Sequence, residues 1–348
     1  MRTYFPFFIC LPLLSSGQEL VSTSPQDRIA LMEDFVAIHC GYCPAGRIFS
    51  DSLQAAHPDK FVVVGVHSGG LADPSAGEPD FRTVWGPELR SFFNVNAQPR
   101  GVINRHAVNG VYGLSRTGWA SAVNNILAQP SPVNIGMASA FDAESHLLTV
   151  NVELYYTGDS PGGNDYVTVL LQEDHIIGYQ QDWDFGPWAD YDHENVLRAI
   201  ITPTWGDEVS TTTTGSFVER TYTFTVPEQW NIDNCTVVAF IGEYQGEVYQ
   251  AKEVSATDGT TTSISALTAK GIPLPWPVPA DEQVFIPLSS SEARSTIRVT
   301  DNLGRVVISE RSSSDKAELD VRAWPTGVYS FNISNATGVR TGRFVVQR

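Results

Sequence analysis

The sequence predicts an α/β domain, followed by an antiparallel β-sandwich domain and a small all-β, Ig-like module at the C-terminal end. Residues 29–127 alternate short apolar runs with amphipathic segments, which is typical of a sheet with helices on its faces. After Pro130 the helical patterns stop, and strand-like runs follow one another between turn residues. Residues 273–279 carry a proline at every second position, which predicts a stiff, extended linker before the last module.

The first domain is predicted over residues 25–130. Pro44 suits the first turn of a helix, and the segment after it repeats apolar residues on one face. Gly86-Pro87 is expected to interrupt a helical pattern over 81–93. In chain order we expect a strand at 29–38, a helix at 45–56, a strand at 61–66, the interrupted helix, a strand at 101–106 and a closing helix at 119–127.

The second domain is predicted over residues 131–268, the linker over 269–280 and the last module over 281–348. The second domain should contain strands, with turn residues clustered at 158–163. Its expected strands are 147–154, 166–171, 222–226 and 235–241. In the last module we expect a hairpin over 295–308 that turns at 301–304, and further strands at 327–331 and 343–346.

Charge is distributed unevenly along the 348 residues. The formal net charge is −17, which argues against a nucleic-acid partner. Residues 131–280 hold 4 basic and 21 acidic side chains, so nearly all of the imbalance lies in the middle third. A well-solvated β surface accounts for this acidity, and a cation site or a basic partner is the alternative.

The N-terminal segment 1–17 has the pattern of a Sec signal peptide. Arg2 is followed by the apolar run 5–14, which is too short to span a bilayer, and then by the small residues 15–17. We expect cleavage before Gln18 and export through the periplasm. Cys10 lies inside the apolar run without small residues before it, so we do not expect a lipoprotein. No later run approaches the ~18 apolar residues of a membrane helix.

Three cysteines remain after that cleavage: Cys40, Cys43 and Cys235. One close pair and one spare thiol do not make a framework of several disulfides, so they indicate local chemistry at Cys40 and Cys43. Cys235 begins a predicted strand and is most simply a small buried apolar residue.

The Cys40-Gly41-Tyr42-Cys43 motif lies at a predicted junction of strand and helix. We expect the helix to begin at Cys40, where its dipole and unpaired N–H groups would favour the thiolate. Cys43, one turn further, could then close a disulfide with Cys40. A structural disulfide, half of a zinc site and accidental spacing remain as alternatives, although no second Cys pair or His pair completes a zinc site. We expect no metal and no cofactor, since no nucleotide-binding loop or hydrolase motif is present.

Residues 32–43 resemble the active-site stretch of thioredoxin-fold oxidoreductases. The resemblance implies that Asp34, six positions before Cys40, handles the proton of Cys43. It also implies a cis-proline beside the cysteines, for which Pro99 after Gln98 is the candidate. Two departures are His39, where thioredoxins usually have Trp, and Gln98, where Thr is frequent. In the redox interpretation Cys40 attacks and is exposed, Cys43 resolves and is shielded, and Pro99 shapes the substrate groove.

Residues 25–270 as a whole resemble the outer-membrane-protein-28-related family of bacterial surface proteins. The likeness rests on four stretches: Glu33-Asp34-Phe35, the motif at 40–44, Pro99-Arg100-Gly101-Val102-Ile103-Asn104-Arg105, and His193-Glu194-Asn195-Val196-Leu197-Arg198-Ala199. It implies fold and compartment more than a reaction.

The last module resembles a type IX secretion C-terminal sorting domain, through residues 301–307 and 324–329. Residues 277–280 depart from the Asn-Pro-Ala that such domains often carry. The resemblance implies the type IX machinery as a partner, passage through the outer membrane and removal of the module. We therefore expect a secreted or surface-attached protein that exchanges thiols and disulfides on exported proteins. The alternative is a non-catalytic receptor or adhesin in which the Cys40–Cys43 bond is structural.

Residues 182–194 combine five acidic and four aromatic side chains. The carboxylates could hold calcium, and the aromatic rings could bind a carbohydrate or a peptide. The spacing does not match an EF-hand, so a solvated acidic loop is the simpler interpretation.

Overall fold

The computed structural model describes residues 20–257, 280–288, 295–301, 305–312, 316–335 and 338–346. The chain divides into two compact units, Met1–Gly259 and Thr260–Arg348, which are described separately below. The predicted signal peptide, with Cys10 and Gln18, lies outside the described residues, as do nearly all of the predicted linker and three of the four residues of the predicted turn at 301–304.

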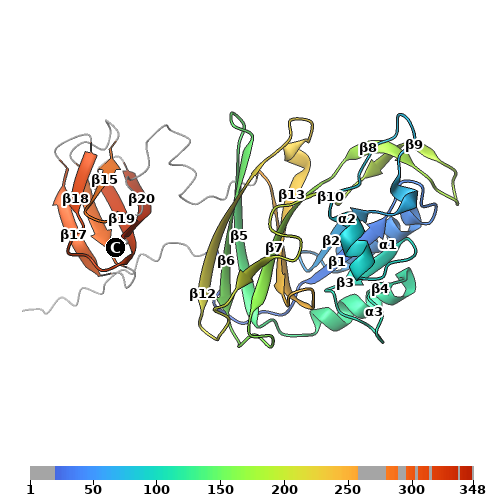
Figure 1. Ribbon diagram of the computed structural model, residues 1–348, viewed down its shortest axis with the longest axis horizontal. Coiled ribbons are helices and arrows are strands. Elements are labelled where there is room, and N and C mark those ends of the chain that lie inside the picture. The colour runs from blue at the N-terminus through green and yellow to red at the C-terminus, as the bar shows by residue number, and fades with distance from the viewer. Residues whose placement is uncertain are drawn as a thin grey trace, which may run out of the picture. The chain divides into compact units, whose positions relative to one another are not determined.

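The first unit begins with a mixed α/β segment and continues with β-strands (Figure 1). The α/β segment consists of β1 (Ala30–Val36), α1 (Cys43–Ala56), β2 (Phe61–His67), the 3₁₀ turn η1 (Gly70–Ala72), α2 (Gly86–Phe92), β3 (Arg100–Ile103), β4 (Gly113–Leu114) and α3 (Arg116–Leu127). The later elements are β5 (Val133–Asp142), β6 (Leu147–Tyr156), β7 (Asp165–Glu173), β8 (Ile176–Gln180), β9 (Trp188–His193), β10 (Val196–Ile200), β11 (Asp207–Val209), β12 (Phe217–Thr225), η2 (Ile232–Asn234), β13 (Cys235–Gly242) and β14 (Val248–Ser255).

The predicted strands and helices of the α/β segment are present, with one difference at α2. The pattern over 81–93 predicted a helix broken at Gly86-Pro87, whereas α2 begins at Gly86. Proline has no N–H to donate, and the first turn of a helix leaves its N–H groups without intrahelical partners. Pro87 therefore starts this helix instead of interrupting it.

One nine-stranded mixed sheet joins the α/β segment to the later strands. Its order is β14-β13-β7-β10-β2-β1-β3-β4, and β11 pairs with β7. β1 and β2 are parallel, β3 is antiparallel to β1, and β10 adds to β2 in parallel with Val196 opposite Gly65. Residues on both sides of the predicted boundary at 130 thus contribute to one sheet, and that boundary stays a prediction.

The later strands also form a second, three-stranded antiparallel sheet in the order β12-β6-β5. The residues of β6 alternate strictly between partly exposed and buried, which is the period of a strand with one buried face. Val150, Val152 and Leu154 of β6 share one apolar core with Val167, Val169 and Leu171 of β7. Burying each such side chain contributes about 1.5–3 kcal/mol, so this core holds the two sheets together.

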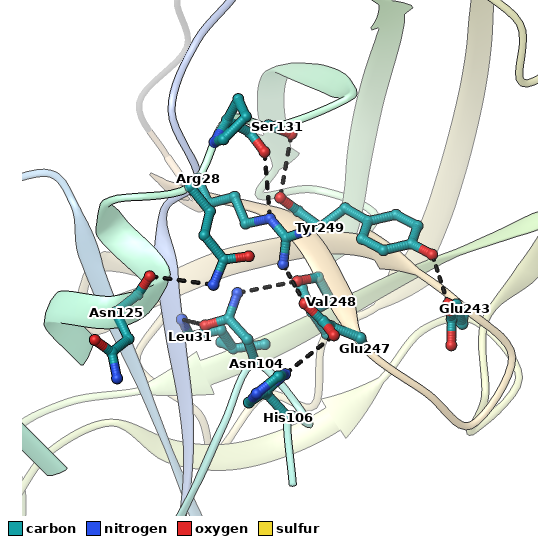
Figure 2. Close-up of polar contacts among 12 residues, drawn as sticks. Arg28, Leu31, Asn104, His106, Asn125, Ser131, Glu243, Glu247, Val248 and Tyr249 are labelled. Atoms are coloured by element: carbon teal, nitrogen blue, oxygen red, sulfur yellow. Dashed lines mark hydrogen bonds and ion pairs between the residues drawn. The ribbon is translucent and has the colours of Figure 1, made fainter. Parts of the chain in front are cut away.

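Polar contacts fasten the α/β segment to the β13–β14 hairpin (Figure 2). The Asn104 side chain accepts a hydrogen bond from Leu31 N–H at 2.8 Å and donates one to Val248 O at 3.1 Å. Val248 N–H returns a bond to Asn104 O at 2.9 Å, and Glu247 pairs with Arg28 and His106. These contacts are made within one compact unit, so the α/β segment is held in a fixed position beside the later strands.

The second unit consists of two antiparallel sheets, as the all-β prediction requires. The first pairs β15 (Gln283–Pro287) with β18 (Lys316–Asp320). The second has the order β17-β16-β19-β20, formed by β17 (Val306–Arg311), β16 (Thr296–Thr300), β19 (Gly327–Asn335) and β20 (Gly338–Val346). The core of the second unit includes Trp324, Tyr329 and Phe344.

Within the described ranges, no helix is both long enough and apolar enough to cross a membrane.

Candidate redox site

Cys40, in the turn after β1, forms a disulfide with Cys43, the first residue of α1. Cys40 N–H bonds to Ala37 O and Cys43 N–H bonds to Cys40 O, each at 3.1 Å, so the backbone turns tightly here. The two Cα atoms are 5.4 Å apart. This spacing lies in the usual range for a disulfide, and the pair can therefore be joined without displacing the backbone.

Two details of the cysteine geometry differ from the sequence prediction. The helix begins at Cys43, with Tyr42 as its N-cap, and not at Cys40. Cys40 lies in the turn that connects the end of β1 to the start of α1. Cys40 was expected to be exposed, yet the exposed fractions are 3% for Cys40 and 5% for Cys43, so both residues are buried.

Asp34 lies in the middle of β1, opposite Gly65 of β2 and Gly101 of β3. The residue is 5% exposed, and its Oδ1 atom has no hydrogen-bond partner among the described residues. Burial away from water disfavours the charged carboxylate and raises the pKa of Asp34 to about 7. An aspartate with such a pKa can take up and release a proton near neutral pH.

The peptide bond between Gln98 and Pro99 is cis, as the resemblance implied. The Gln98 side-chain amide donates to Val36 O at 2.7 Å and to Ser68 O at 2.8 Å, which ties the proline turn to the ends of β1 and β2. A Cβ atom on Gly46 would lie 2.9 Å from Pro99 Cγ, so the proline ring packs directly against α1. The Pro99 ring thus lies against the helix that begins at Cys43.

The η1 turn lies against the other side of the disulfide. Ala72 belongs to a small buried cluster with Cys40, Cys43 and Ala37. His39 N–H bonds to Leu71 O at 3.0 Å. The His39 ring, which replaces the Trp expected from the resemblance, contacts Glu78 Oε2 at 2.8 Å.

The hairpin β8–β9 and its connecting loop cover the disulfide, a feature absent from the sequence prediction. Figure 1 shows β8 and β9 reaching toward α1 and α2. The Gln180 side-chain amide donates to Cys40 O at 3.1 Å and to Ala37 O at 3.3 Å. Gln181 N–H bonds to Ile38 O at 2.7 Å, and Trp183 N–H bonds to Gly41 O at 3.0 Å.

Trp183 lies directly on Gly41, the first of the two residues between the cysteines. A Cβ atom on Gly41 would lie 2.3 Å from Cδ1 and Cγ of Trp183, so only glycine leaves room for the ring. Tyr42 meets the same ring edge-on, with 4.5 Å between the ring centroids. Trp183, one of the four aromatic residues noticed in the sequence, therefore lies at the candidate redox site.

Two buried histidines anchor the hairpin to β2. The His67 and His193 rings are 6.0 Å apart, and both contact the Phe81 ring. Burial lowers the pKa of His67 to about 3 and that of His193 to about 4. Both rings are therefore neutral at neutral pH, as their apolar surroundings require.

Three of the stretches on which the family resemblance rested have structural roles here. The Arg105 guanidinium donates to both Glu33 oxygens, at 2.8 and 2.9 Å, in an ion pair whose side chains are each 4% exposed. Asn195 O accepts the N–H of Gly65 at 2.6 Å where β10 joins β2. These residues hold the sheet together beside the disulfide.

His175, Asp192 and Glu194 bring three potential metal ligands within 4.8 Å of one another. His175 already bonds to Asp192 at 3.1 Å, and Arg47 pairs with Glu194. The calcium alternative also involved Asp182, whose carboxylate accepts N–H groups of its own loop at 2.8 and 3.3 Å. Hydrogen bonds and ion pairs within the protein thus engage the side chains of Asp182, Asp192 and Glu194.

Cys235 is 1% exposed, and burial raises the pKa of its thiol to about 12. Such a thiol is not reactive at neutral pH. This agrees with its interpretation as a buried apolar residue.

Comparison with known proteins gives two family matches. Residues 87–258 match the family model of outer membrane protein Omp28, and residues 275–347 match that of the secretion system C-terminal sorting domain. A comparison with curated protein sequences found no match.

Several solved structures are similar. HBP35 of Porphyromonas gingivalis aligns over 92% of this chain and 99% of its own, with a TM-score of 0.55 and 16% identity. A domain of the outer membrane lipoprotein Omp28 from Porphyromonas gingivalis aligns over 36% of this chain and 89% of its own, with a TM-score of 0.26 and 20% identity. At these identities the likeness to HBP35 concerns the fold alone.

The two family matches agree with the β-rich first unit and with the separate all-β second unit. The sorting tail and the outer membrane family indicate a protein that is secreted or attached to the cell surface. Residues 87–258 thus match the Omp28 family, and residues 275–347 match the type IX secretion sorting domain.

Proposed function

We propose that this cell-surface protein exchanges thiols and disulfides with exported proteins, and that its first segment has a thioredoxin-like fold. The order β2-β1-β3-β4, with α1 following β1 and α3 following β4, supports that fold. The proposed sites are Cys40, Cys43, Asp34 and Pro99. The observation that carries the proposal is the buried, unpaired Asp34 carboxyl, with its pKa of about 7, in the strand that leads to the disulfide.

The proposed reaction oxidises a substrate dithiol. A substrate thiolate attacks Sγ of Cys40, a mixed disulfide forms, and Cys43 leaves as a thiolate. Asp34, in its protonated form, supplies a proton to Cys43. The second substrate thiolate then attacks the substrate sulfur of the mixed disulfide and releases Cys40. The substrate loses two electrons, and the Cys40–Cys43 pair gains them.

The test is to trap the mixed disulfide in the reverse direction. Reduced Cys43→Ser protein should hold disulfide-bearing exported proteins through Cys40, because the resolving thiol is missing. Cys40→Ser is the matched control. It should trap far less of the exported proteins, since Cys43 lies in the first turn of α1. Non-reducing gels with mass spectrometry would identify the adducts. Equal trapping by both variants, or none by either, would contradict the proposal.

A non-catalytic surface receptor or adhesin is the second candidate. The burial of both cysteines beneath the β8–β9 hairpin favours it, because a structural disulfide needs no access. In that case, loss of either cysteine should trap no partner and should lower the melting temperature.

A further inference from the structure

The loop between β8 and β9 has an inner face that seals the disulfide. Trp183 rests on Gly41, and the Gln180 amide bonds to the carbonyl of Cys40. Neither cysteine is more than 5% exposed. A thiol or reductant that attacks Cys40 therefore needs the residues around the sulfur to move, since exchange needs an in-line approach to it, and this loop lies on the turn that carries the disulfide.

The cover is organised as one piece. The Asp182 carboxylate accepts the backbone N–H groups of Asp184 and Phe185 and the indole N–H of Trp188, at 2.8, 3.3 and 3.2 Å. These bonds lie within the loop and do not involve the disulfide turn. The loop can therefore leave the disulfide without losing its own shape, and Trp183 would move with it.

The outer face of the cover is apolar and acidic. Phe185 and Trp188 are 79% and 44% exposed, and Trp183, which rests on Gly41 with one side, is still 63% exposed. The exposed carboxylates of Asp184 and Asp190 have no ion-pair partner among the described residues. No lysine or arginine occurs between residues 174 and 195. Exposed rings beside uncompensated negative charge attract a partner that carries both cations and apolar groups.

We propose that residues 181–190 are the docking surface for an extended polypeptide segment with basic and apolar side chains, and that docking draws Trp183 off Gly41 and uncovers the disulfide. The docking step stands independently, whereas the use of the uncovered disulfide rests on the proposed exchange function. Such a cover restricts thiol exchange to polypeptides that bind the loop first.

The first test measures the rate at which dithiothreitol reduces the Cys40–Cys43 bond in the full chain, followed by alkylation of the released thiols. Trp183→Ala should accelerate reduction by about tenfold or more, because the closed state loses the contact that seals it. Phe185→Ala is the matched control, since Phe185 is in the same loop, is more exposed and has no ring contact with the disulfide turn. It should change the rate by less than about twofold. Equal reduction rates in the two variants would contradict the claim that Trp183 shields the disulfide.

The second test adds a synthetic peptide of alternating lysine and leucine to the oxidised wild-type chain. The peptide should bind, and at saturation it should accelerate reduction by dithiothreitol by about tenfold, while a glutamate–leucine peptide should have no effect. The double variant Asp184→Asn, Asp190→Asn should lose this response. Equal responses to the two peptides, or none to either, would overturn the docking surface. Neither test requires catalysis, so a chain that passes both but traps no partner keeps the docking surface and loses only the exchange function.

Discussion

Asp34 and Asp165 are both buried on the nine-stranded sheet, but their surroundings differ. Asp165, which begins β7 beside the three-stranded sheet, is 0% exposed and accepts hydrogen bonds from Tyr156 at 2.9 Å and Ser160 at 2.5 Å. Asp34, which lies in β1 near the disulfide, has an oxygen with no partner among the described residues. Strand β7 therefore satisfies its buried acid, whereas β1 leaves its own partly unsatisfied.

This difference teaches what each carboxyl does. Buried polar groups are normally hydrogen-bonded, and one that is not costs stability. Asp165 organises the loop that precedes β7, so its role is structural. Asp34 destabilises the strand that carries it, and such groups concentrate at functional sites.

The largest change in the free energy of unfolding is expected at Asp165, whose carboxylate accepts two hydrogen bonds. Asp165→Ala should lower the free energy of unfolding by about 3 kcal/mol, because it leaves the buried hydroxyl of Tyr156 without its acceptor and opens a cavity. Urea denaturation of the wild type and the variant would measure this. A loss below about 1 kcal/mol would erase the contrast with Asp34.

For Asp34, near the disulfide, we expect substitution to raise the stability instead of lowering it. Folded Asp34 holds its proton up to about pH 7, whereas the unfolded chain releases it near pH 4, so Asp34 costs increasing stability as the pH rises between these values. Asp34→Asn should therefore stabilise the oxidised protein at pH 8 by on the order of 2 kcal/mol, and much less at pH 4.5. Thermal unfolding at both values tests this. A destabilised variant at pH 8 would show that the carboxylate has a structural partner.

The buried histidines should give a smaller effect in the other pH direction. His67 and His193 stay neutral when folded, while the unfolded chain protonates them below about pH 6.5, so stability falls as the pH drops. His67→Gln should reduce this acid sensitivity by about 1 kcal/mol between pH 6.5 and 5. Parallel denaturation series at the two pH values would measure it. Equal slopes in both proteins would mean that His67 takes no part.

Local patterns predicted much of the site. The apolar run of β1 and Pro44 located the strand and the helix around the cysteines, whereas Asp34 and Pro99 became candidates only through the resemblance to thioredoxin-fold oxidoreductases. The cover was missed because Gln180 follows Cys40 by 140 residues and contacts it through a backbone carbonyl. Trp183 likewise packs on a glycine, and such contacts leave no periodic signal. The pairing of β10 with β2 is also long-range, and strand pairing of that kind depends on the whole fold.

The reduction potential of the Cys40–Cys43 pair tests the central claim most directly. The oxidised chain would be equilibrated in thiol–disulfide buffers of defined potential, long enough for the cover to open, and its free thiols counted. A redox-active pair should titrate in the range of the known oxidoreductases, between about −270 and −120 mV. A potential below about −300 mV would identify a structural disulfide and contradict the exchange function.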